Sequence, residues 1–398
     1  MTARYKKAIC CLLKMLHEAR KEPFSNIQKW LTLQEALIKK LVYIENKIRH
    51  CKKEINELNI KRKNPEFKLT KEESIIVKES LNFIEYKIDE YKWLILILKS
   101  IGDGIAFTFI HKLDIKPQNF KESPGFISGK KGIILEKKIL RYSFKRGLIA
   151  IMNDLTSVLK YADITLINED IFFPIEVKTS VMDNSRINRQ KDKTNKLYKY
   201  LFEDVSFDLY GDGTKEMRRV EIGSSEINYI EQFNKLLLSA KKKGYAFSSF
   251  EDGFSCLIAY EEFGNNVFDK IVEKGRFEKP IFFHLNMNKF VGQGYYPFSL
   301  IFNHGEQYWD FLEGLLNIIV FIDISKIERT SKKNGFIVER AIDENWAFSF
   351  KSVNPDAAIK EFKMSEHFFF RSFMELVSID WLLTDTFDRI KNEPISAA

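Results

Sequence analysis

The chain has few of the residues that stabilise small secreted or metal-bound domains. Its 398 residues include only four cysteines and six histidines. The cysteines, Cys10, Cys11, Cys51 and Cys256, show neither a disulfide framework nor the paired spacing of a zinc site, and the histidines form no HxxxH-like cluster. A zinc centre is therefore not predicted, and a reducing cytoplasm is the expected location.

Long hydrophobic segments and nucleotide-binding loops are also missing. The longest apolar run in the N-terminal third, Trp93–Leu98, is far too short to span a membrane. The basic first residues precede no long hydrophobic region or small-residue cleavage site, so no secretory signal is expected. The glycines at 125 and 129 are spaced too closely for a phosphate-binding loop, and Lys131 replaces its Ser or Thr. An NTPase is therefore not predicted.

Positive charge is concentrated at the N-terminus. Residues 1–70 hold 17 Lys and Arg against 7 Asp and Glu, a net charge of +10, whereas the remaining residues hold 46 against 48, a net charge of −2. A basic arm can capture nucleic acid with salt-sensitive affinity. It can equally keep a long helical hairpin in solution, and the sequence leaves both interpretations open.

The apolar pattern predicts a chain of α/β (α+β) class that is divided into three domains. Leu and Ile at helical spacing predict helices over 26–60 and 70–99, the second starting at a capping box, Thr70–Glu73, and ending in a turn that contains Asp103. We expect this hairpin domain to span 1–115, a core domain 116–222, and a C-terminal α/β domain 223–398, which holds most of the 35 phenylalanines. The Leu/Ile seam is typical of internal packing or of an oligomer interface.

Beyond residue 203, strands are predicted at about 215–223, 245–250, 255–260 and 282–287. Helices are predicted over 226–243, 306–320 and 364–390. No charged constellation there indicates catalysis, and the phenylalanines are expected to form a second core.

Three charged residues stand out in the segment Tyr161–Ser180, which reads as two strands joined by a polar turn. Centring the hairpin between Glu169 and Asp170 places Asp163 opposite Glu176, with Cβ atoms roughly 5 Å apart. Lys178 shares the face of Glu176, because alternate residues of a strand point the same way. Two facing carboxylates repel unless a cation or proton lies between them. A hard cation such as Mg²⁺ suits this arrangement.

This pattern, Asp followed by Glu-x-Lys on adjacent strands, resembles the active site of the PD-(D/E)xK nuclease superfamily, the restriction-endonuclease-like fold. The resemblance covers about residues 130–202, and Ala162 stands where the family often has proline. It implies an αβββαβ core and a Mg²⁺ site (Mn²⁺ possible) at Asp163 and Glu176, with Lys178 orienting water or stabilising charge. An ordinary surface hairpin is the alternative. Pro174 cannot donate a ladder hydrogen bond, so the second strand is expected to begin there.

Two flanking helices extend the resemblance. On a helix between Gly129 and Gly147, Glu136 falls inside an apolar stripe, where an unpaired charge is costly. The family's first helix often supplies a Glu to the metal, and Glu136 matches it; pairing with Lys137 or Arg141 is the alternative. Asp154 follows as a capping residue or a neighbour of the metal, capping being preferred.

The second flanking helix, predicted over 184–203, carries a polar residue on its buried side and a basic row beside it. Gln190 and Tyr198 match a Gln and a Tyr found in some relatives. The row can follow a phosphate backbone or be a solvated helix face; its members are Arg186, Arg189, Lys193 and Lys196.

The resemblance implies a Mg²⁺-dependent nuclease acting on DNA, with RNA not excluded. Restriction-like or anti-phage defence would suit such an enzyme. The alternative is an inactive nuclease-fold protein that binds nucleic acid or scaffolds a complex. A homo-oligomer or a partner protein, joined through the N-terminal helices, is expected in either case.

Overall fold

The computed structural model describes most of the chain. The described residues are 3–63, 69–119, 125–130, 132–168, 171–177, 185–209, 216–219, 224–260, 269, 271, 273–275, 277–288, 294–341, 345–357 and 359–392, with only the backbone of 3, 119, 185–191, 193 and 194. Helices and antiparallel sheets alternate, which confirms a mixed α/β class. Two compact units result: Met1–Arg219 with Gly292–Leu300, and Val220–Val291 with Ile301–Ala398.

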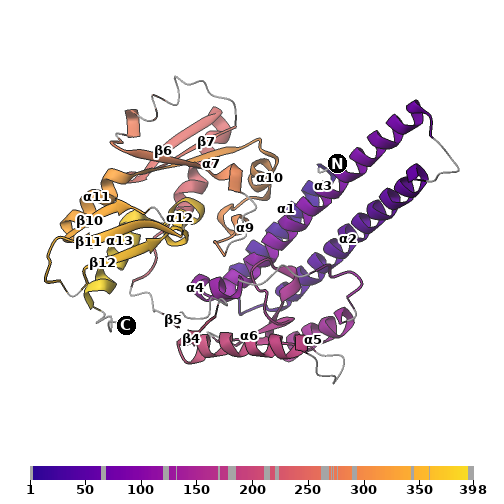
Figure 1. The fold of residues 1–398 in the computed structure, drawn as a ribbon, viewed down its shortest axis with the longest axis horizontal. Helices are drawn as coiled ribbons and strands as arrows, with labels where there is room; N and C mark the ends of the chain where they lie inside the picture. The colour runs from indigo at the N-terminus through magenta and orange to yellow at the C-terminus, as the bar shows by residue number, and fades with distance from the viewer. Residues whose placement is uncertain are drawn as a thin grey trace. The chain divides into compact units, whose positions relative to one another are not determined.

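The first unit begins with three long helices: α1 (Ala3–Arg20), α2 (Gln28–Lys63) and α3 (Lys71–Phe109) (Figure 1). The predicted capping box starts α3, since the Thr70 hydroxyl accepts from the Glu73 amide at 3.2 Å and the Glu73 carboxylate from the Thr70 amide at 2.8 Å. The Leu/Ile seam is buried among these helices within one chain.

The helix α3 runs past its predicted end. Residues Ser100–Ile105 were expected to form a turn, and this prediction is wrong, because α3 continues to Phe109. A Cβ at Gly102 would lie 2.0 Å from the Leu155 carbonyl oxygen, so glycine is needed where the helix backbone approaches the next segment. The glycines therefore serve close packing of a helix and do not end it.

The core that follows has the element order α5, β1, β2, β3, α6, β4. The short α4 (Lys112–Ile115) and η1 (Lys116–Asn119) precede it. The core begins with α5 (Ile133–Lys145), β1 (Ile149–Met152), β2 (Ile164–Asn168) and β3 (Ile171–Ile175). The three strands form an antiparallel sheet in the order β1-β2-β3. The helix α6 (Ser185–Phe202) agrees with its predicted range, and β4 (Val205–Phe207) pairs with β5 (Glu216–Arg218).

The second unit contains two sheets. One has the order β6-β7-β9-β8 and the other the order β10-β11-β12. The strands are β6 (Tyr245–Glu251), β7 (Phe254–Ala259), β8 (Pro280–His284), β9 (Asn317–Asp323), β10 (Phe336–Arg340), β11 (Trp346–Ser352) and β12 (Glu361–Ser365). The helical elements whose bounds the structure describes from residue 230 onward are α7 (Ile230–Lys243), η3 (Leu285–Asn288), α9 (Phe298–Ile301), α10 (Gly305–Glu313), α11 (Ile324–Lys333), α12 (Glu366–Glu375) and α13 (Ile379–Asn392).

Aromatic side chains build the core of this unit, as predicted. Phe350 stacks on Phe362 with ring centroids 4.6 Å apart, and Phe387 packs edge-on against both. Two predicted helices are wrong in part: residues 317–320 belong to the strand β9, and 364–390 divide into the end of β12, α12 and α13. Gly314 and Leu376, both at positive φ, end the helices α10 and α12.

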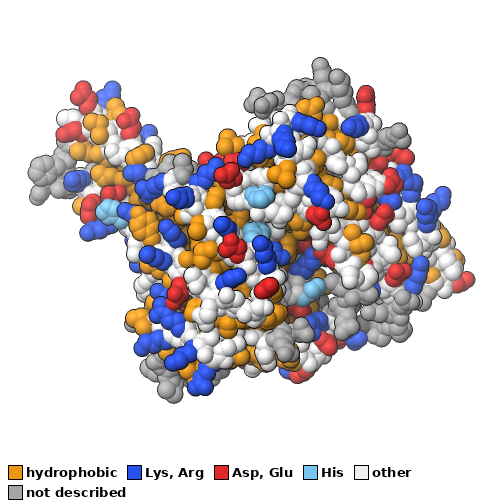
Figure 2. Space-filling view, turned by 180° about the vertical axis from the view of Figure 1, so that it is seen from behind, with side chains coloured by type: hydrophobic (Ala, Val, Ile, Leu, Met, Phe, Trp, Pro, Cys, Tyr) orange, Lys and Arg blue, Asp and Glu red, His pale blue; other side chains and the backbone are white. Residues whose placement is uncertain are grey.

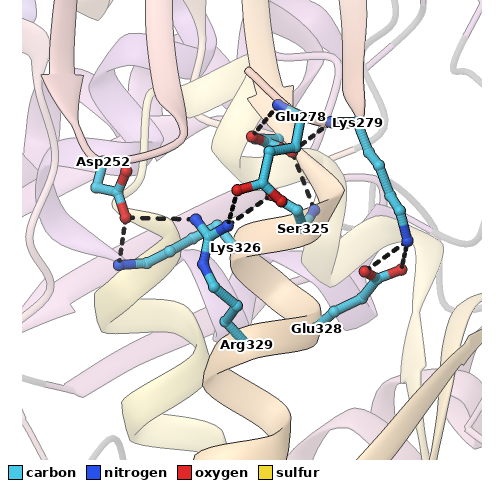
Figure 3. Close-up of polar contacts among 8 residues, drawn as sticks. Asp252, Glu278, Lys279, Ser325, Lys326, Glu328 and Arg329 are labelled. Carbon is cyan, nitrogen blue, oxygen red and sulfur yellow. Dashed lines mark hydrogen bonds and ion pairs between the residues drawn. The ribbon is translucent and has the colours of Figure 1, made fainter. Parts of the chain in front are cut away.

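A charged network covers the start of α11 (Figure 3). Asp323 caps the helix by accepting from the amides of Ser325, Glu278 and Lys279 at 2.9–3.0 Å. Around it, Lys326 and Arg329 contact Asp252, and Lys279 contacts both oxygens of Glu328. Every labelled charge in this network faces an opposite one, so it stabilises the fold.

No helix in the described part of the chain combines the length and hydrophobicity needed to cross a bilayer.

Candidate active site

Asp163 lies immediately before β2, in a backbone that is hydrogen-bonded on both sides. Its amide donates to the Ile175 carbonyl at 3.1 Å, and its carbonyl accepts from the Asn153 amide at 3.0 Å. Ala162, just before it, has φ of 65°, a left-handed conformation uncommon outside glycine. The Asp163 Oδ2 atom accepts from the Val177 amide at 2.9 Å. The position of this carboxylate is therefore set by both neighbouring strands.

The predicted register of the hairpin is confirmed within β2 and β3, from Ile164 opposite Ile175 to Asn168 opposite Ile171. The prediction that the second strand begins at Pro174 is wrong, because Pro174 lies inside β3, opposite Thr165. This proline is tolerated because β3 is at the edge of the three-stranded sheet.

The ladder ends one residue before the predicted Asp163–Glu176 pair. The Asp163 amide bonds to Ile175 and not to Glu176, which follows the strand and is half-buried. Direct opposition of these two carboxylates therefore stays a prediction. Lys178 lies outside the described residues.

Three carboxylates converge on the ammonium group of Lys130. Its Nζ atom lies 2.9 Å from Asp163 Oδ1, 2.9 Å from Asp154 Oδ2 and 3.0 Å from Glu136 Oε1. The carboxylates come from three different elements: β2 is adjacent to Asp163, η2 (Asn153–Leu155) carries Asp154, and α5 carries Glu136. The Lys130 side chain is 33 % exposed, whereas that of Glu136 is 1 % exposed. We call Lys130, Glu136, Asp154 and Asp163 the Lys130 cluster.

Glu136 is buried beside Leu140 and Phe144, as its place in the apolar stripe predicted. The alternative pairing with Arg141 is wrong, because Arg141 bonds to Glu35 at 2.6 Å. Only one Glu136 oxygen is satisfied: Oε2 is buried and has no hydrogen-bond partner among the described residues. Burial raises the pKa of Glu136 against the opposing effect of Lys130. This carboxyl group therefore has an acceptor that faces no donor.

The charge on Lys130 is strongly favoured. Burial alone would lower its pKa, but attraction by Asp154 and the hydrogen bonds to Asp163, Asp154 and Glu136 raise it above the usual value. The ammonium therefore stays protonated and supplies three hydrogen bonds, which is its full donor capacity.

Asp154 belongs to this cluster, although capping was the preferred prediction. The turn that carries it is held by Asn153, whose side-chain amide donates to the Tyr161 carbonyl at 2.6 Å and accepts from the Thr165 hydroxyl at 2.8 Å. From the sequence, Asp154 was expected to be either a capping residue or a neighbour of the metal. The sequence favoured capping, whereas the structure places its carboxylate on Lys130.

Two side chains of α2 hold the segments next to the cluster in place. The Glu45 carboxylate accepts from the amides of Ile127 and Ser128 at 3.0 and 2.6 Å, which fixes the segment leading to Lys130. Gln34 donates to the Ala150 carbonyl at 2.8 Å and accepts from the Met152 amide at 2.9 Å, so it acts as a neighbouring strand for β1. The helical hairpin is thus part of the scaffold of the site.

Asp103, another buried acid, lies on α3 close to the cluster. Asp103 accepts from the Ser157 amide and hydroxyl at 2.6 Å and from the Val158 amide at 3.3 Å. Burial raises the pKa of Asp103 to about 6, against the effect of these hydrogen bonds. Burial lowers the pKa of Lys99, which feels the charges of Asp154 and Asp103. Asp103 therefore joins a helix to the turn after η2, and its predicted role in a turn is wrong.

The residues expected on α6 are described only in part. The Tyr198 hydroxyl donates to the Pro174 carbonyl at 2.5 Å, which ties α6 to the strand next to Glu176. Lys196 bonds to the Asp208 carboxylate at 2.6 Å, so this member of the basic row has a local partner. The other side chains predicted to contact nucleic acid lie outside the described residues; they are Gln190, Arg186, Arg189 and Lys193.

In the part of the chain that the structure describes, no group of three or more His, Cys, Asp or Glu side chains is spaced to hold a metal ion. The carboxylates of the Lys130 cluster are instead arranged around an ammonium group. Their chemistry still fits a hard divalent cation, because all donors are carboxylate oxygens and Glu136 Oε2 is left over.

The second unit holds a cavity of about 580 Å³. Its walls are mostly aromatic and aliphatic, and two of its carboxylates, Glu328 and Glu339, are paired with Lys279 and Lys351. Most of the cavity lining is therefore apolar, and these two carboxylates already have partners.

Comparison of the chain with family models, with curated proteins and with solved structures gives no match.

Proposed function

We propose that the protein is a metal-dependent nuclease that hydrolyses phosphodiester bonds in DNA. The observation that carries this proposal is the convergence of Glu136 and Asp163, two residues chosen from sequence, on one cation position beside the strand end that leads to Glu176. The order α5-β1-β2-β3-α6-β4 also agrees with the αβββαβ order of the restriction-endonuclease-like core. One difference is that β4 pairs with β5 and not with the three-stranded sheet.

In this proposal Asp163, Glu176 and Glu136 hold Mg²⁺ or Mn²⁺. The bound ion would polarise the scissile phosphate and lower the pKa of a coordinated water. Lys178, two residues after Glu176, orients the attacking water or stabilises charge that builds up on the phosphorus centre. The Lys and Arg side chains of α6 contact the phosphate backbone of the substrate.

The test is cleavage of supercoiled plasmid DNA with Mg²⁺ by wild type, Asp163→Asn and Lys178→Ala. We expect each substitution to lower the rate about a hundredfold or more, because each removes a group that acts on the transition state. Lys138→Ala, an exposed lysine of α5, is the matched control and should cleave like wild type. Equal cleavage by all four proteins would refute the assignment.

A binding protein without catalysis is the second candidate function. It is favoured by the Lys130 ammonium, which already neutralises part of the acidic cluster without a metal ion. On the face shown in Figure 2, Lys and Arg side chains are scattered among acidic and apolar ones and do not form one continuous patch. Calorimetric titration of wild type and Asp163→Asn with Mg²⁺ separates the two functions, since only the nuclease requires metal binding that Asp163→Asn loses.

A further inference from the structure

We propose that Lys130 is a built-in cation that competes with a divalent metal ion for the centre of the Lys130 cluster. In the absence of metal the ammonium holds the carboxylates together, and the metal binds only when this side chain leaves. The inference rests on the proposed function, because it describes how metal enters that site.

The first argument is charge. Three carboxylates share one cation within 3.0 Å, so removal of the ammonium would leave like charges facing one another in a half-buried place. Glu136 is 1 % exposed and cannot escape into water. Something positively charged, or a proton, must therefore occupy this position in every state of the folded protein.

The second argument is the unsatisfied oxygen. The Lys130 ammonium has three donors, and all three are used by one oxygen each of Glu136, Asp154 and Asp163. Glu136 Oε2 remains buried without a partner among the described residues. A metal ion takes more oxygen ligands than an ammonium has protons, so it can use the oxygen that Lys130 leaves unsatisfied.

The third argument is that the Lys130 side chain can move while the backbone before it stays fixed. The backbone before Lys130 is fixed by Glu45, which holds the amides of Ile127 and Ser128. The Lys130 side chain itself is one-third exposed and has a flexible four-carbon stem. Exchange therefore begins with rotation of this side chain into solvent. The three carboxylates, which lie on α5, on η2 and just before β2, then draw closer together, because a metal ion binds oxygen at a shorter distance than an ammonium group does.

The test is thermal unfolding of Lys130→Met in EDTA and in Mg²⁺ or Mn²⁺, at matched ionic strength. Without metal we expect the Tm of Lys130→Met to fall by about 5–10 °C relative to wild type, because the carboxylates lose their cation. Addition of Mg²⁺ should restore most of this loss, whereas the Tm of wild type should change little. Calorimetry should show Mg²⁺ binding about tenfold or more tighter to Lys130→Met, because the competing cation is gone.

Two further variants control the experiment. Lys138→Met removes an exposed lysine of α5 and should show neither effect. Lys130→Met combined with Glu136→Gln removes a negative charge as well, so it should be more stable in EDTA than Lys130→Met and gain less from Mg²⁺. This double variant also provides the comparison if Lys130→Met alone does not fold.

The outcomes separate the inference from the proposed function. Suppose that wild type cleaves plasmid DNA, but that metal raises the Tm of neither Lys130→Met nor the double variant. That result would overturn the role given to Lys130. Rescue of Lys130→Met by Mg²⁺ without any cleavage by wild type would leave the cation exchange standing and overturn the nuclease.

Discussion

At the scale of single residues, the molecule places several acids where water does not reach. Asp103, Glu45 and Glu136 are each at most 5 % exposed. Donors from a distant part of the chain hold Asp103 and Glu45, and Lys130 holds Glu136. Such groups fix the geometry of a site because each joins two separate segments of the chain. Burial raises the pKa of Asp103 and of Glu136, so these two also make stability depend on pH.

Asp103 gives a direct prediction of that dependence. Its folded pKa of about 6 lies above the ordinary 3.8, so its contribution to the free energy of unfolding is fully present below the ordinary pKa and is lost as the pH rises through about 6. Asp103→Asn, which keeps the shape and an acceptor for Ser157 and Val158, should not show this loss. Relative to the variant, wild type should lose roughly 2 kcal/mol between about pH 4 and about pH 7.

Urea denaturation of both proteins at the two pH values measures the difference. Asp89→Asn, an exposed residue of the same helix, is the control and should follow wild type. The prediction is wrong if the free energy of unfolding changes equally with pH in wild type and in Asp103→Asn. The Asp103 carboxyl group would then have the same pKa in the folded and unfolded states.

Some residues of the candidate site could be predicted from the sequence and others could not. Glu136 was recognisable because a carboxylate inside an apolar helical stripe is unusual, and Asp163 because strand alternation placed it at the head of a hairpin. Lys130 gave no signal, since it is followed by a second lysine and lies in no periodic pattern. Its role depends on three carboxylates that come together only in the folded chain.

At the scale of elements, the contacts between α2 and β1 determine whether the sheet is complete. Gln34 is fully buried and supplies one donor and one acceptor to the free edge of β1. Gln34→Ala should therefore lower the free energy of unfolding by about 2–4 kcal/mol, because two buried backbone groups lose their partners. Gln28→Ala, on the exposed start of the same helix, should cost little.

Chemical denaturation of the two variants provides the comparison. Amide hydrogen exchange of Met152, whose amide donates to Gln34, should become faster in Gln34→Ala only. Unchanged protection of Met152 would mean that another group or a water molecule replaces the glutamine.

Element boundaries show where local sequence rules are overruled. The capping box at Thr70 and the hairpin register were predictable because both depend on residues close in sequence. The Ser100–Ile105 segment reads as a turn by composition, yet packing against Leu155 requires its glycines inside a helix. In 317–323, an Ile- and Val-rich run forms the inner strand β9, and only its pairing with both β7 and β8 distinguishes it from a buried helix.

At the scale of the whole molecule, the helical hairpin and the core from α5 to α6 belong to one compact unit. The boundaries predicted at 115 and 222 stay predictions for independently folding domains. Deletion of residues 1–110 should nevertheless do more than remove an oligomerisation arm. It takes away Gln34, Glu45 and Asp103, so β1, β2 and β3 should lose their protection from hydrogen exchange.

A shortened hairpin is the matched control for this deletion. Residues 58–63 and 69–76, at the end of the hairpin, are mostly exposed. Replacing 58–76 with a short Gly-Ser linker should therefore leave the exchange of β1, β2 and β3 unchanged. Protection that survives deletion of 1–110 would instead establish the core as a separate domain.

The segment Gly292–Leu300 returns from the second unit to the first. The Ser299 hydroxyl donates to the Ser100 carbonyl at 2.6 Å, and Arg20 donates to the Tyr296 hydroxyl at 2.8 Å. During synthesis on the ribosome, α1 and α3 emerge long before these partners. The helices α1 and α3 therefore stay incompletely packed until about three quarters of the chain has been synthesised.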